Sequence, residues 1–261
     1  MTLTFYKYQG TGNDFVMVDN RRNVIGNYNA KQIAFLCDRR FGIGADGLIL
    51  LENHESADFK MIYFNSDGNQ SSMCGNGGRC IVAFAKFLSI IEDEASFEAI
   101  DGMHQAKIEN DIVHLQMQDV STLETFDTHT FLDTGSPHHV ALTENLKGLD
   151  VKVEGAKIRF GTPYGRSGTN VNFVSKLDTA EFAVRTYERG VEDETLSCGT
   201  GVTAVALAMN SIGKTDQNLV TLQTMGGALQ VSFEKEQKAY TNIWLIGKAT
   251  QVFKGDIEWT L

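Results

Sequence analysis

The chain has 261 residues, of which 42% are hydrophobic and 21% are charged, and it contains 25 Gly but only 2 Pro. This composition excludes a disordered or collagen-like protein, and the length allows one large domain or two modest ones. Lys and Arg number 23 against 33 Asp and Glu, which gives a net charge of −10 at pH 7. A chain this acidic repels nucleic acid and anionic membrane surfaces, so we expect neither as a partner.

No segment of the sequence has the character of a membrane span or a secretory signal. The longest apolar run, residues 81–88, contains Lys86 and is much shorter than the roughly 18 residues that a span needs. Residues 1–10 lack the charged start and the apolar stretch of a signal peptide. We therefore expect a cytoplasmic protein with reduced thiols. None of the four Cys is spaced C-x-x-C, and we expect no metal site.

Short strands dominate the elements predicted for the first half. The pattern favours strands at residues 3–8, 15–19, 48–52, 59–65, 105–109 and 112–118. Asn29 and Gln32 have the spacing of a capping box at the start of a helix that reaches Cys37. A second helix is expected at about residues 76–88.

The second half repeats this pattern. We expect strands at residues 140–142, 170–174, 181–187, 219–223, 229–233 and 240–246, with a helix at about residues 200–209. An offset of 124 to 125 residues aligns segment 10–16 with 135–140, segment 44–50 with 168–174, and Cys74-Gly-Asn-Gly with Cys198-Gly-Thr-Gly. Chance recurrence of Gly is the alternative, but the preserved order favours an internal duplication.

Each C-G-x-G segment stands directly before a helix that is apolar on nearly all sides, so both helices should be buried. A buried helix start carries backbone N–H groups and about half a positive charge, which suits a carboxylate or phosphate. The same field lowers the pKa of a thiol at the cap position. Cys74 and Cys198 could be ordinary buried caps, but Ser, Thr, Asp or Asn would cap better. We interpret this pair as chemical, and Cys37 and Cys80 as packing residues.

Two such thiols, one from each half, would stand on opposite faces of one bound carbon. One thiolate would remove a proton and the opposite thiol would return one, which inverts the stereocentre. The helix starts would stabilise the substrate carboxylate as its negative charge increases. The expected activity is the epimerisation or racemisation of a small amino acid.

Six motifs follow one another along the chain: QGTGNDFVMVD, RRFGIGADG, YFNSDGNQSSMCGNGGRC, GSPHHV, GTNVNF and YERGVEDETLSCGTG. With these motifs the sequence resembles the diaminopimelate epimerase family over essentially its whole length. The resemblance implies cofactor-independent interconversion of LL- and meso-diaminopimelate by two cysteines, in the synthesis of lysine and cell-wall precursors. It also implies a homodimer.

The fold expected from pattern and resemblance together is α+β. It has two pseudo-symmetric domains of mainly antiparallel strands, each wrapped around a central helix. The N-terminal domain would comprise residues 1–118 and a returning C-terminal strand, residues 251–261. The C-terminal domain would comprise residues 119–250.

Position by position, the resemblance assigns the acid and base roles to Cys74 and Cys198. His138 matches a residue beside the first Cys, and Glu188 matches one beside the second, each suited to moving a thiol proton. The substrate-binding positions follow from the same motifs, and they are Asn13, Asn65, Gly75, Asn76, Asn170, Glu188, Arg189, Gly199 and Thr200. Asn13 and the Gly75–Asn76 and Gly199–Thr200 amides would hold the reacting end, and the others would hold the distal amino-acid end.

Three positions depart from the common pattern of the family. Ser136 stands where Asn is common, and Gly47 stands where many members have Gln. The segment before Cys198 is one residue longer, with Glu192 and Asp193 in place of a Gly. None of these changes removes a catalytic group.

Three alternatives remain open from the sequence. A proline racemase or hydroxyproline epimerase also uses two cysteines, although its motifs differ, and the YERG segment favours a substrate with a second charged end. A thiol redox protein would cycle Cys74 and Cys198 through a disulfide, against which stands the lack of a C-x-x-C pair. An anion-binding module without catalysis would keep the glycines and need neither thiol.

Overall fold

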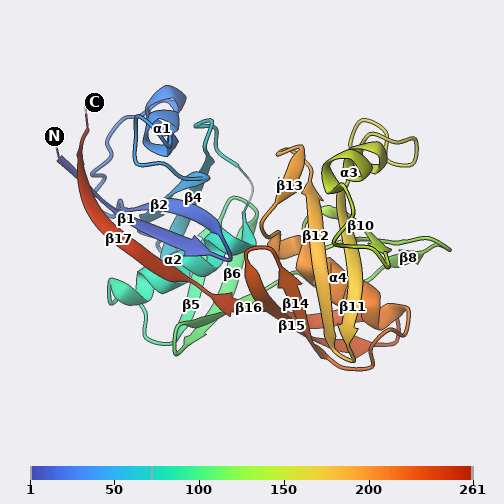
Figure 1. Ribbon diagram of the computed structural model, residues 1–261. Helices are drawn as coiled ribbons and strands as arrows, with labels where there is room; N and C mark the ends of the chain where they lie inside the picture. Colours follow the sequence, from blue (N-terminus) through green and yellow to red (C-terminus); the bar gives the residue numbers. More distant parts are fainter. Residues whose placement is uncertain (1, 72, 260–261) are drawn as a thin grey trace. The chain divides into compact units, whose positions relative to one another are not determined.

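The computed structural model describes residues 2–71 and 73–259, which form two compact units (Figure 1). Unit 1 comprises Met1–Leu115 and Gly247–Leu261, and unit 2 comprises Gln116–Ile246. Strands β1 (Thr2–Gly10) and β17 (Thr250–Glu258) pair antiparallel in unit 1, with Thr2 opposite Glu258. The C-terminal strand thus belongs to the first unit. Residues 260 and 261 of that predicted strand lie outside the described residues.

Unit 1 continues with seven elements. They are β2 (Asn13–Asp19), α1 (Ala30–Cys37), β3 (Gly47–Glu52), β4 (Phe59–Asn65), α2 (Gly75–Phe87), β5 (Glu94–Ala99) and β6 (Gly102–Glu109). Strand β7 (Ile112–Gln116) leads to the boundary between the units. The capping box predicted at the start of α1 is confirmed, because the Asn29 side chain accepts from the Gln32 N–H and the Gln32 side chain accepts from the Asn29 N–H.

Unit 2 begins with β8 (Leu123–Thr125), β9 (Thr130–Asp133), β10 (Pro137–Leu142) and α3 (Val151–Arg159). It continues with β11 (Asn170–Asp178), β12 (Glu181–Glu188), β13 (Asp193–Thr195), α4 (Gly199–Ser211), β14 (Leu219–Thr224), β15 (Gly227–Glu236) and β16 (Ala239–Lys248). The helix α3 and the strands β5, β8, β9 and β13 were not predicted from the sequence.

The two units share one order of strands and helices. In unit 1, β2 pairs parallel with β3, β3 antiparallel with β4, β4 parallel with β5, and β5 antiparallel with β6. In unit 2, β10, β11, β12, β14 and β15 repeat this sequence of pairings. Helices α1 and α3 come at the same step in each series, as do α2 and α4. This common topology agrees with the internal duplication inferred from the sequence, and the α+β class is confirmed.

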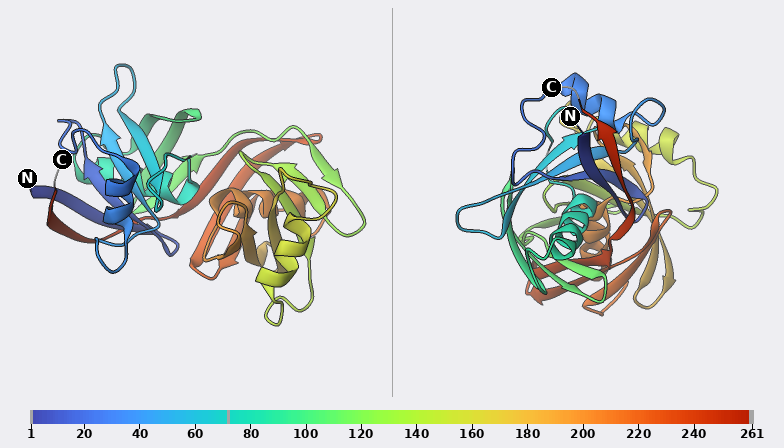
Figure 2. Two further views of the ribbon diagram at one scale, coloured as in Figure 1. Left: turned by 90° about the horizontal axis from the view of Figure 1, so that it is seen from above. Right: turned by 90° about the vertical axis from the view of Figure 1, so that its left-hand side faces the viewer.

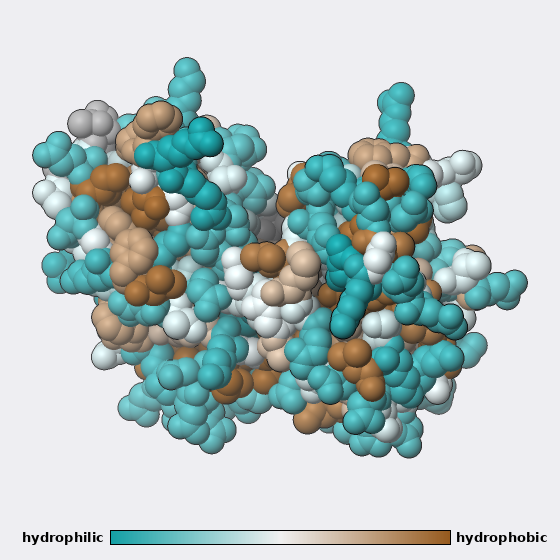
Figure 3. All heavy atoms as spheres, in the orientation of Figure 1, coloured by the Kyte–Doolittle hydropathy of each residue, from teal (hydrophilic) through white to brown (hydrophobic). Residues whose placement is uncertain are grey.

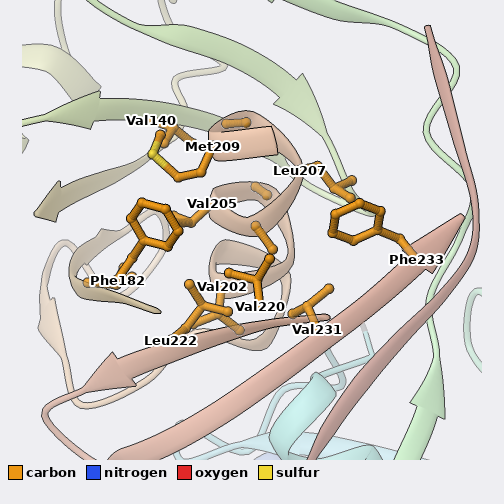
Figure 4. Close-up of a cluster of buried hydrophobic side chains, with 14 of the residues drawn as sticks. Val140, Phe182, Val202, Val205, Leu207, Met209, Val220, Leu222, Val231 and Phe233 are labelled. Atoms are coloured by element: carbon orange, nitrogen blue, oxygen red, sulfur yellow. The ribbon is translucent and has the colours of Figure 1, made fainter. Parts of the chain in front are cut away.

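Each unit encloses one apolar helix, which accounts for the burial of its start. Helix α2 packs against β1, β2, β3, β6 and β17, and Figure 2 shows it inside the strands of unit 1. Helix α4 packs against β9, β10, β11, β12, β14 and β15. Figure 4 shows Val202 and Val205 of α4 in one buried cluster with Phe182, Val220 and Leu222 from the surrounding strands. Burial of each such side chain contributes roughly 1.5–3 kcal/mol to folding.

The surface contrasts with these cores. On the face drawn in Figure 3, hydrophilic residues cover most of both units and hydrophobic ones are scattered among them. Among the described residues, no helix combines the length and the apolar character needed to cross a membrane.

Candidate active site

Cys74 and Cys198 occupy equivalent backbone positions, the N-caps of α2 and α4. Cys74 has φ −108° and ψ 124°, and Cys198 has φ −119° and ψ 115°. Within these described helices, neither side chain makes a capping hydrogen bond. Each helix begins with a buried Gly directly after the cysteine. The positive start of each helix therefore suits an anionic group of a ligand.

The other two cysteines have a different environment. Cys37 and Cys80 are buried, and burial raises the pKa of each thiol to about 12. Both therefore remain protonated at neutral pH, because a buried thiolate lacks solvation. This agrees with their interpretation as packing residues.

In unit 1, Asn13 connects the Cys74 thiol to a carboxylate. Its Oδ1 lies 3.5 Å from Cys74 Sγ and its Nδ2 lies 2.5 Å from Asp46 Oδ2. Because a carboxylate accepts and does not donate at neutral pH, Asp46 fixes the orientation of the Asn13 amide. The oxygen of Asn13 is thereby directed to the cysteine and to Asn76, whose Nδ2 donates to it at 3.3 Å.

Arg79, on the second turn of α2, supports this arrangement from inside the unit. The side chain is fully buried, and its guanidinium donates to Asn76 Oδ1 at 3.0 Å and to Thr11 Oγ1 at 2.9 Å. Its Nε makes no hydrogen bond among the described residues. Burial lowers the pKa of Arg79, and the nearby thiols oppose this shift. Arg79 thus fixes the Asn76 amide, because a guanidinium can only donate.

A group of charged side chains holds the other end of this network. Arg39 donates to Asp14 through two nitrogens and to Asp46, and Lys7 forms an ion pair with Asp14 at 2.7 Å. Burial alone would raise the pKa of Asp14, but hydrogen bonds from Arg39 and Lys7 outweigh it and lower the pKa to about 2. The GTGND and GIGADG segments are therefore joined by ion pairs beside the site.

In unit 2, His138 lies two hydrogen bonds from Cys198. Its Nε2 is 3.0 Å from Thr200 Oγ1, which is 3.4 Å from Cys198 Sγ. Burial, assisted by the charge of Arg189, lowers the pKa of His138 to about 3, so the ring is neutral at pH 7. The expected association of His138 with Cys74 joins residues of different units and stays a prediction.

Ser136 belongs to the same network. Its Oγ lies 3.0 Å from His138 Nε2 and 3.2 Å from Thr200 Oγ1, and it accepts from Asn170 Nδ2 at 3.2 Å. The hydroxyl that stands where the family commonly has Asn is thus linked to Thr200 and, through it, to Cys198.

Three residues expected at the distal end of the substrate come together in unit 2. The Arg189 N–H donates to Asn170 Oδ1 at 2.8 Å, and its side chain donates to the Ser167 carbonyl at 3.2 Å. Glu188 precedes Arg189 and accepts from Thr195 Oγ1 at 2.9 Å. Asn65 is exposed at the end of β4 in unit 1. Its expected association with the other three therefore stays a prediction.

The longer segment before Cys198 is anchored by Glu192. This residue adopts φ 58°, and its carboxylate accepts from Arg159 Nε and Nη2 at 3.2 and 3.0 Å and from the Tyr187 hydroxyl at 3.2 Å. Arg159 is nearly buried. The structure therefore accommodates the longer turn with a left-handed residue that is held by a partly buried ion pair.

Gly47 has a local explanation as well. A Cβ at this position would lie 2.4 Å from the Phe64 carbonyl oxygen and 2.6 Å from Cε2 of Tyr63. A Gln here would require the Tyr63 ring and the neighbouring strand to move. Tyr63 therefore occupies the space over Gly47.

Sequence reasoning missed four residues of these networks: Asp46, Arg79, Ser136 as a hydrogen-bonding group, and Asn172. Asn172 donates through Nδ2 to His138 Nδ1 at 3.0 Å. A signal was present for it, because alternation along β11 puts Asn172 on the same face as Asn170 within an apolar strand. The residues described contain no group of three or more His, Cys, Asp or Glu that could hold a metal ion.

Comparison with solved structures defines the class of protein by its fold. The chain matches a PhzF-family phenazine biosynthesis protein of Bacillus anthracis with a TM-score of 0.76 at 13% identity, covering 99% of each chain. It also matches a hydroxyproline epimerase from Agrobacterium vitis with a TM-score of 0.70 at 12% identity, covering 98% of this chain and 92% of the other. At such low identity these likenesses establish the fold shared by these proteins and not the substrate.

Sequence relatives are more specific. The family model for diaminopimelate epimerase matches residues 5–123 and 130–252. The diaminopimelate epimerase of Flavobacterium psychrophilum is 59% identical over 98% of this chain and all of the relative, and that of Chlorobaculum tepidum is 43% identical over 95% and 98%. The chain belongs to the diaminopimelate epimerase family, whose members are isomerases, and the resemblance seen in its motifs is confirmed.

Proposed function

We propose that this protein interconverts LL- and meso-diaminopimelate without a cofactor, through Cys74 and Cys198. The observation that carries the proposal is the pair of cysteines at the equivalent starts of α2 and α4, each followed by a buried Gly. The relatives at 59% and 43% identity support diaminopimelate as the substrate. The family resemblance further supports a role in lysine and cell-wall precursor synthesis, as a cytoplasmic homodimer.

The reaction is a pair of proton transfers. One sulfur, as thiolate, takes the α-proton, and the electron pair of the C–H bond remains on the α-carbon and its carboxylate. The second sulfur, as thiol, gives its proton to the opposite face of the carbon. The two sulfurs thus exchange their protonation states, and nothing is oxidised or reduced. The N–H groups at the two helix starts stabilise the negative charge on the carboxylate.

The other residues of the site have supporting roles in this proposal. The amides of Gly75, Asn76, Gly199 and Thr200 bind the reacting carboxylate, and Asn13 contacts the same end. Asn170, Glu188, Arg189 and Asn65 bind the distal amino-acid end, where Arg189 suits its carboxylate and Glu188 its ammonium group. His138 and Glu188 are the groups suited to moving a thiol proton.

The direct test is an isomer-resolved assay in D2O with fresh, fully reduced protein and no added cofactor. We expect LL-diaminopimelate to become meso and to gain deuterium at the α-carbon. A parallel panel of proline, trans-4-hydroxyproline and glutamate tests the alternative substrates. Folded, reduced protein that leaves LL-diaminopimelate unchanged, or that epimerises hydroxyproline in its place, would overturn the proposal.

A further inference from the structure

The loop between α3 and β11, residues 160–169, is anchored to the sheet of unit 2 by one tyrosine. Residues 162, 163 and 165–167 are exposed, whereas Tyr164 is half-buried. Its hydroxyl lies 2.7 Å from His139 Nδ1. Within the described segment 161–167, no other side chain makes a hydrogen bond. Tyr164 is therefore the residue that ties this loop to β10.

The partner of Tyr164, His139, is firmly held in the sheet. It lies in the middle of β10, where it pairs with Phe131 of β9 and Val171 of β11. Its ring stacks on the His129 ring with 4.1 Å between the centroids, and the Tyr164 ring stacks on Phe131 at 5.3 Å. These ring contacts add to the hydrogen bond. Both the hydroxyl and the ring of Tyr164 are thus fixed by residues of the sheet.

Both partners of the hydrogen bond are uncharged at neutral pH. Burial, together with the charge of His129, lowers the pKa of His139 to about 4. Burial and the nearby Glu124 raise the pKa of Tyr164 to about 12. A neutral imidazole and a neutral phenol form a hydrogen bond with either tautomer of the ring. The contact is therefore intact under the conditions of an activity assay.

Tyr164 also fixes the peptide group between Ser167 and Gly168. The Gly168 N–H donates to the Tyr164 carbonyl at 3.0 Å, and the Ser167 carbonyl accepts from Arg189 Nη1 at 3.2 Å. This N–H and this carbonyl belong to one peptide unit, and they point in opposite directions because the unit is planar and trans. The bond to Tyr164 therefore determines where the carbonyl points, and the carbonyl points to Arg189.

The conformation of Gly168 supports this arrangement. Its φ is 61°, and a Cβ at this position would lie 1.6 Å from Arg159 Nη1 at the end of α3. Only Gly suits both the left-handed backbone and the close contact. The peptide is thus packed closely against a nearly buried guanidinium, which leaves it little freedom to turn.

Arg189 is held by its backbone and by its side chain. Its N–H donates to Asn170 Oδ1 at 2.8 Å. Within the described part of the chain, the bond to the Ser167 carbonyl is the hydrogen bond of its guanidinium. The remaining N–H groups can therefore form the two parallel hydrogen bonds with which a guanidinium binds a carboxylate. A side chain that is oriented before the substrate arrives loses less conformational freedom on binding.

We propose that Tyr164 is a positioning residue for the binding of the substrate's distal carboxylate. Through His139 it holds the loop, and through its own carbonyl it holds the peptide that orients the Arg189 guanidinium. The role of Arg189 at the distal carboxylate comes from the proposed function, on which this inference rests. Tyr164 acts through Arg189 and takes no part in proton transfer, so its effect falls on substrate binding.

The first test is the steady-state kinetics of Tyr164→Phe with LL-diaminopimelate. This change removes the hydroxyl and keeps the ring that stacks on Phe131. We expect KM to rise about fivefold, the size of one uncharged hydrogen bond, while kcat stays within about twofold of the parent. His139→Phe removes the same hydrogen bond from the other side. It should raise KM alike, and the double variant should not exceed either single one.

The matched control is Tyr240→Phe in the same unit. Tyr240 is buried, and its hydroxyl donates to Asn210 Oδ1 at 2.9 Å. The change removes a comparable hydrogen bond that leads to no residue of the proposed site. KM should therefore stay within about twofold of the parent.

An Arg189→Ala background separates positioning from a general loss of structure. Without the guanidinium, Tyr164 has nothing to orient. Adding Tyr164→Phe should then leave kcat/KM within about twofold, as measured by deuterium incorporation at low substrate concentration. A further fivefold loss in this background would overturn the inference, and so would an unchanged KM in Tyr164→Phe alone.

Hydrogen exchange tests the loop without substrate. In Tyr164→Phe the Gly168 amide should exchange about fivefold faster than in the parent protein, and in Tyr240→Phe it should exchange at the parent rate. Unchanged exchange at Gly168 in Tyr164→Phe would also overturn the inference. Folded parent protein that leaves LL-diaminopimelate unchanged would contradict the proposed function, and the exchange rate would then still decide whether Tyr164 holds this peptide.

Discussion

The two helix starts have the same backbone geometry but different hydrogen-bond partners. Cys74 and Cys198 are 124 residues apart, as are Asn76 and Thr200, and Asn13 aligns with His138 in the sequence repeat. In each unit the second residue of the helix bonds to the aligned strand residue, Asn76 to Asn13 and Thr200 to His138. In unit 1 an amide oxygen lies beside the sulfur, and in unit 2 a hydroxyl group does. The duplication therefore supplies two equal positions, and the side chains behind them differ.

The largest expected effect comes from removing either sulfur. Cys74→Ala and Cys198→Ala should each lower kcat for epimerisation by at least about a thousandfold, because each direction of the reaction needs both an acid and a base. The measurement is the isomer-resolved assay with LL-diaminopimelate. Cys37→Ala, which removes a buried thiol elsewhere, should keep activity within about threefold of the parent. Activity close to that of the parent protein in either Cys74→Ala or Cys198→Ala would show that the two thiols are not equally required.

The two units should also differ in their response to mild acid. Burial lowers the pKa of His138 to about 3 and that of His139 to about 4. The unfolded chain therefore binds more protons below about pH 6.5, and stability that is complete above this pH is lost progressively as pH falls toward the folded values. At pH 5 each of these two histidines should lower the stability of unit 2 by about 2 kcal/mol, which makes about 4 kcal/mol together.

Unit 1 should keep most of its stability at that pH. The pKa of Asp14 is lowered to about 2, and the stability that this shift contributes is lost only when the pH falls through the ordinary carboxyl range and below it. His114 shifts in the same direction as His138 but is more exposed, so its contribution is smaller. Hydrogen exchange at pH 7 and pH 5, corrected for the intrinsic rate and read for α2 and α4, measures the difference. Equal loss of protection in both helices would contradict it.

A smaller effect is expected from releasing the Asn13 amide beside Cys74. Asp46→Asn replaces an obligate acceptor with an amide that can also donate, so Asn13 can turn its nitrogen toward the sulfur. We expect kcat to fall about tenfold. The midpoint of the pH profile for alkylation of Cys74 by iodoacetamide should move to lower pH. The matched change Asp19→Asn, at a carboxylate bound to Arg21 at the end of β2, should leave both quantities unchanged. A Cys74 midpoint that stays fixed in Asp46→Asn would show that the amide orientation does not govern this thiol.

The smallest expected effect concerns the segment that leads into each of the two helices, from β4 to α2 and from β12 to α4. The segment before Cys198 is anchored by the Arg159–Glu192 pair, whereas the segment after β4 contains a short turn in which Asp67 accepts from Asn69. Glu192→Gln should lower the free energy of unfolding by about 1 kcal/mol. The variant leaves the buried Arg159 guanidinium without its carboxylate partner, and the effect stays small because that carboxylate is partly exposed. Urea denaturation measures this, with Glu154→Gln in an exposed pair as control. A control loss as large as that of Glu192→Gln would refute the anchoring role.

The elements that position the site could be predicted from the sequence because their signals are local. The glycines after Cys74 and Cys198, followed by apolar runs, marked α2 and α4 within one or two residues. Helix α3 was missed because Gly155 and several charged residues interrupt its apolar pattern. The short strands β8 and β13, three residues each, carry too few residues for a period to show.

The position of the two cysteines at helix starts could be predicted from the sequence, but the orientation of the amides around them could not. Asp46 is 33 residues from Asn13, and Asn172 is 34 residues from His138. Their effect depends on which atom of an amide faces which partner, and residue types alone leave that choice open. Arg79 was hidden for another reason, because a buried guanidinium bound to neutral oxygens is unexpected from a charge pattern.

The most direct measurement of opposite protonation is a pH titration by NMR of protein labelled with 13C at the cysteine Cβ, assigned through Cys74→Ala and Cys198→Ala. The chemical shift of Cβ reports thiol or thiolate at each site without a reagent. We predict a pH range in which one of the two cysteines has the thiolate shift while the other still has the thiol shift. Coincident titration of the two signals would contradict the proposed acid and base pair.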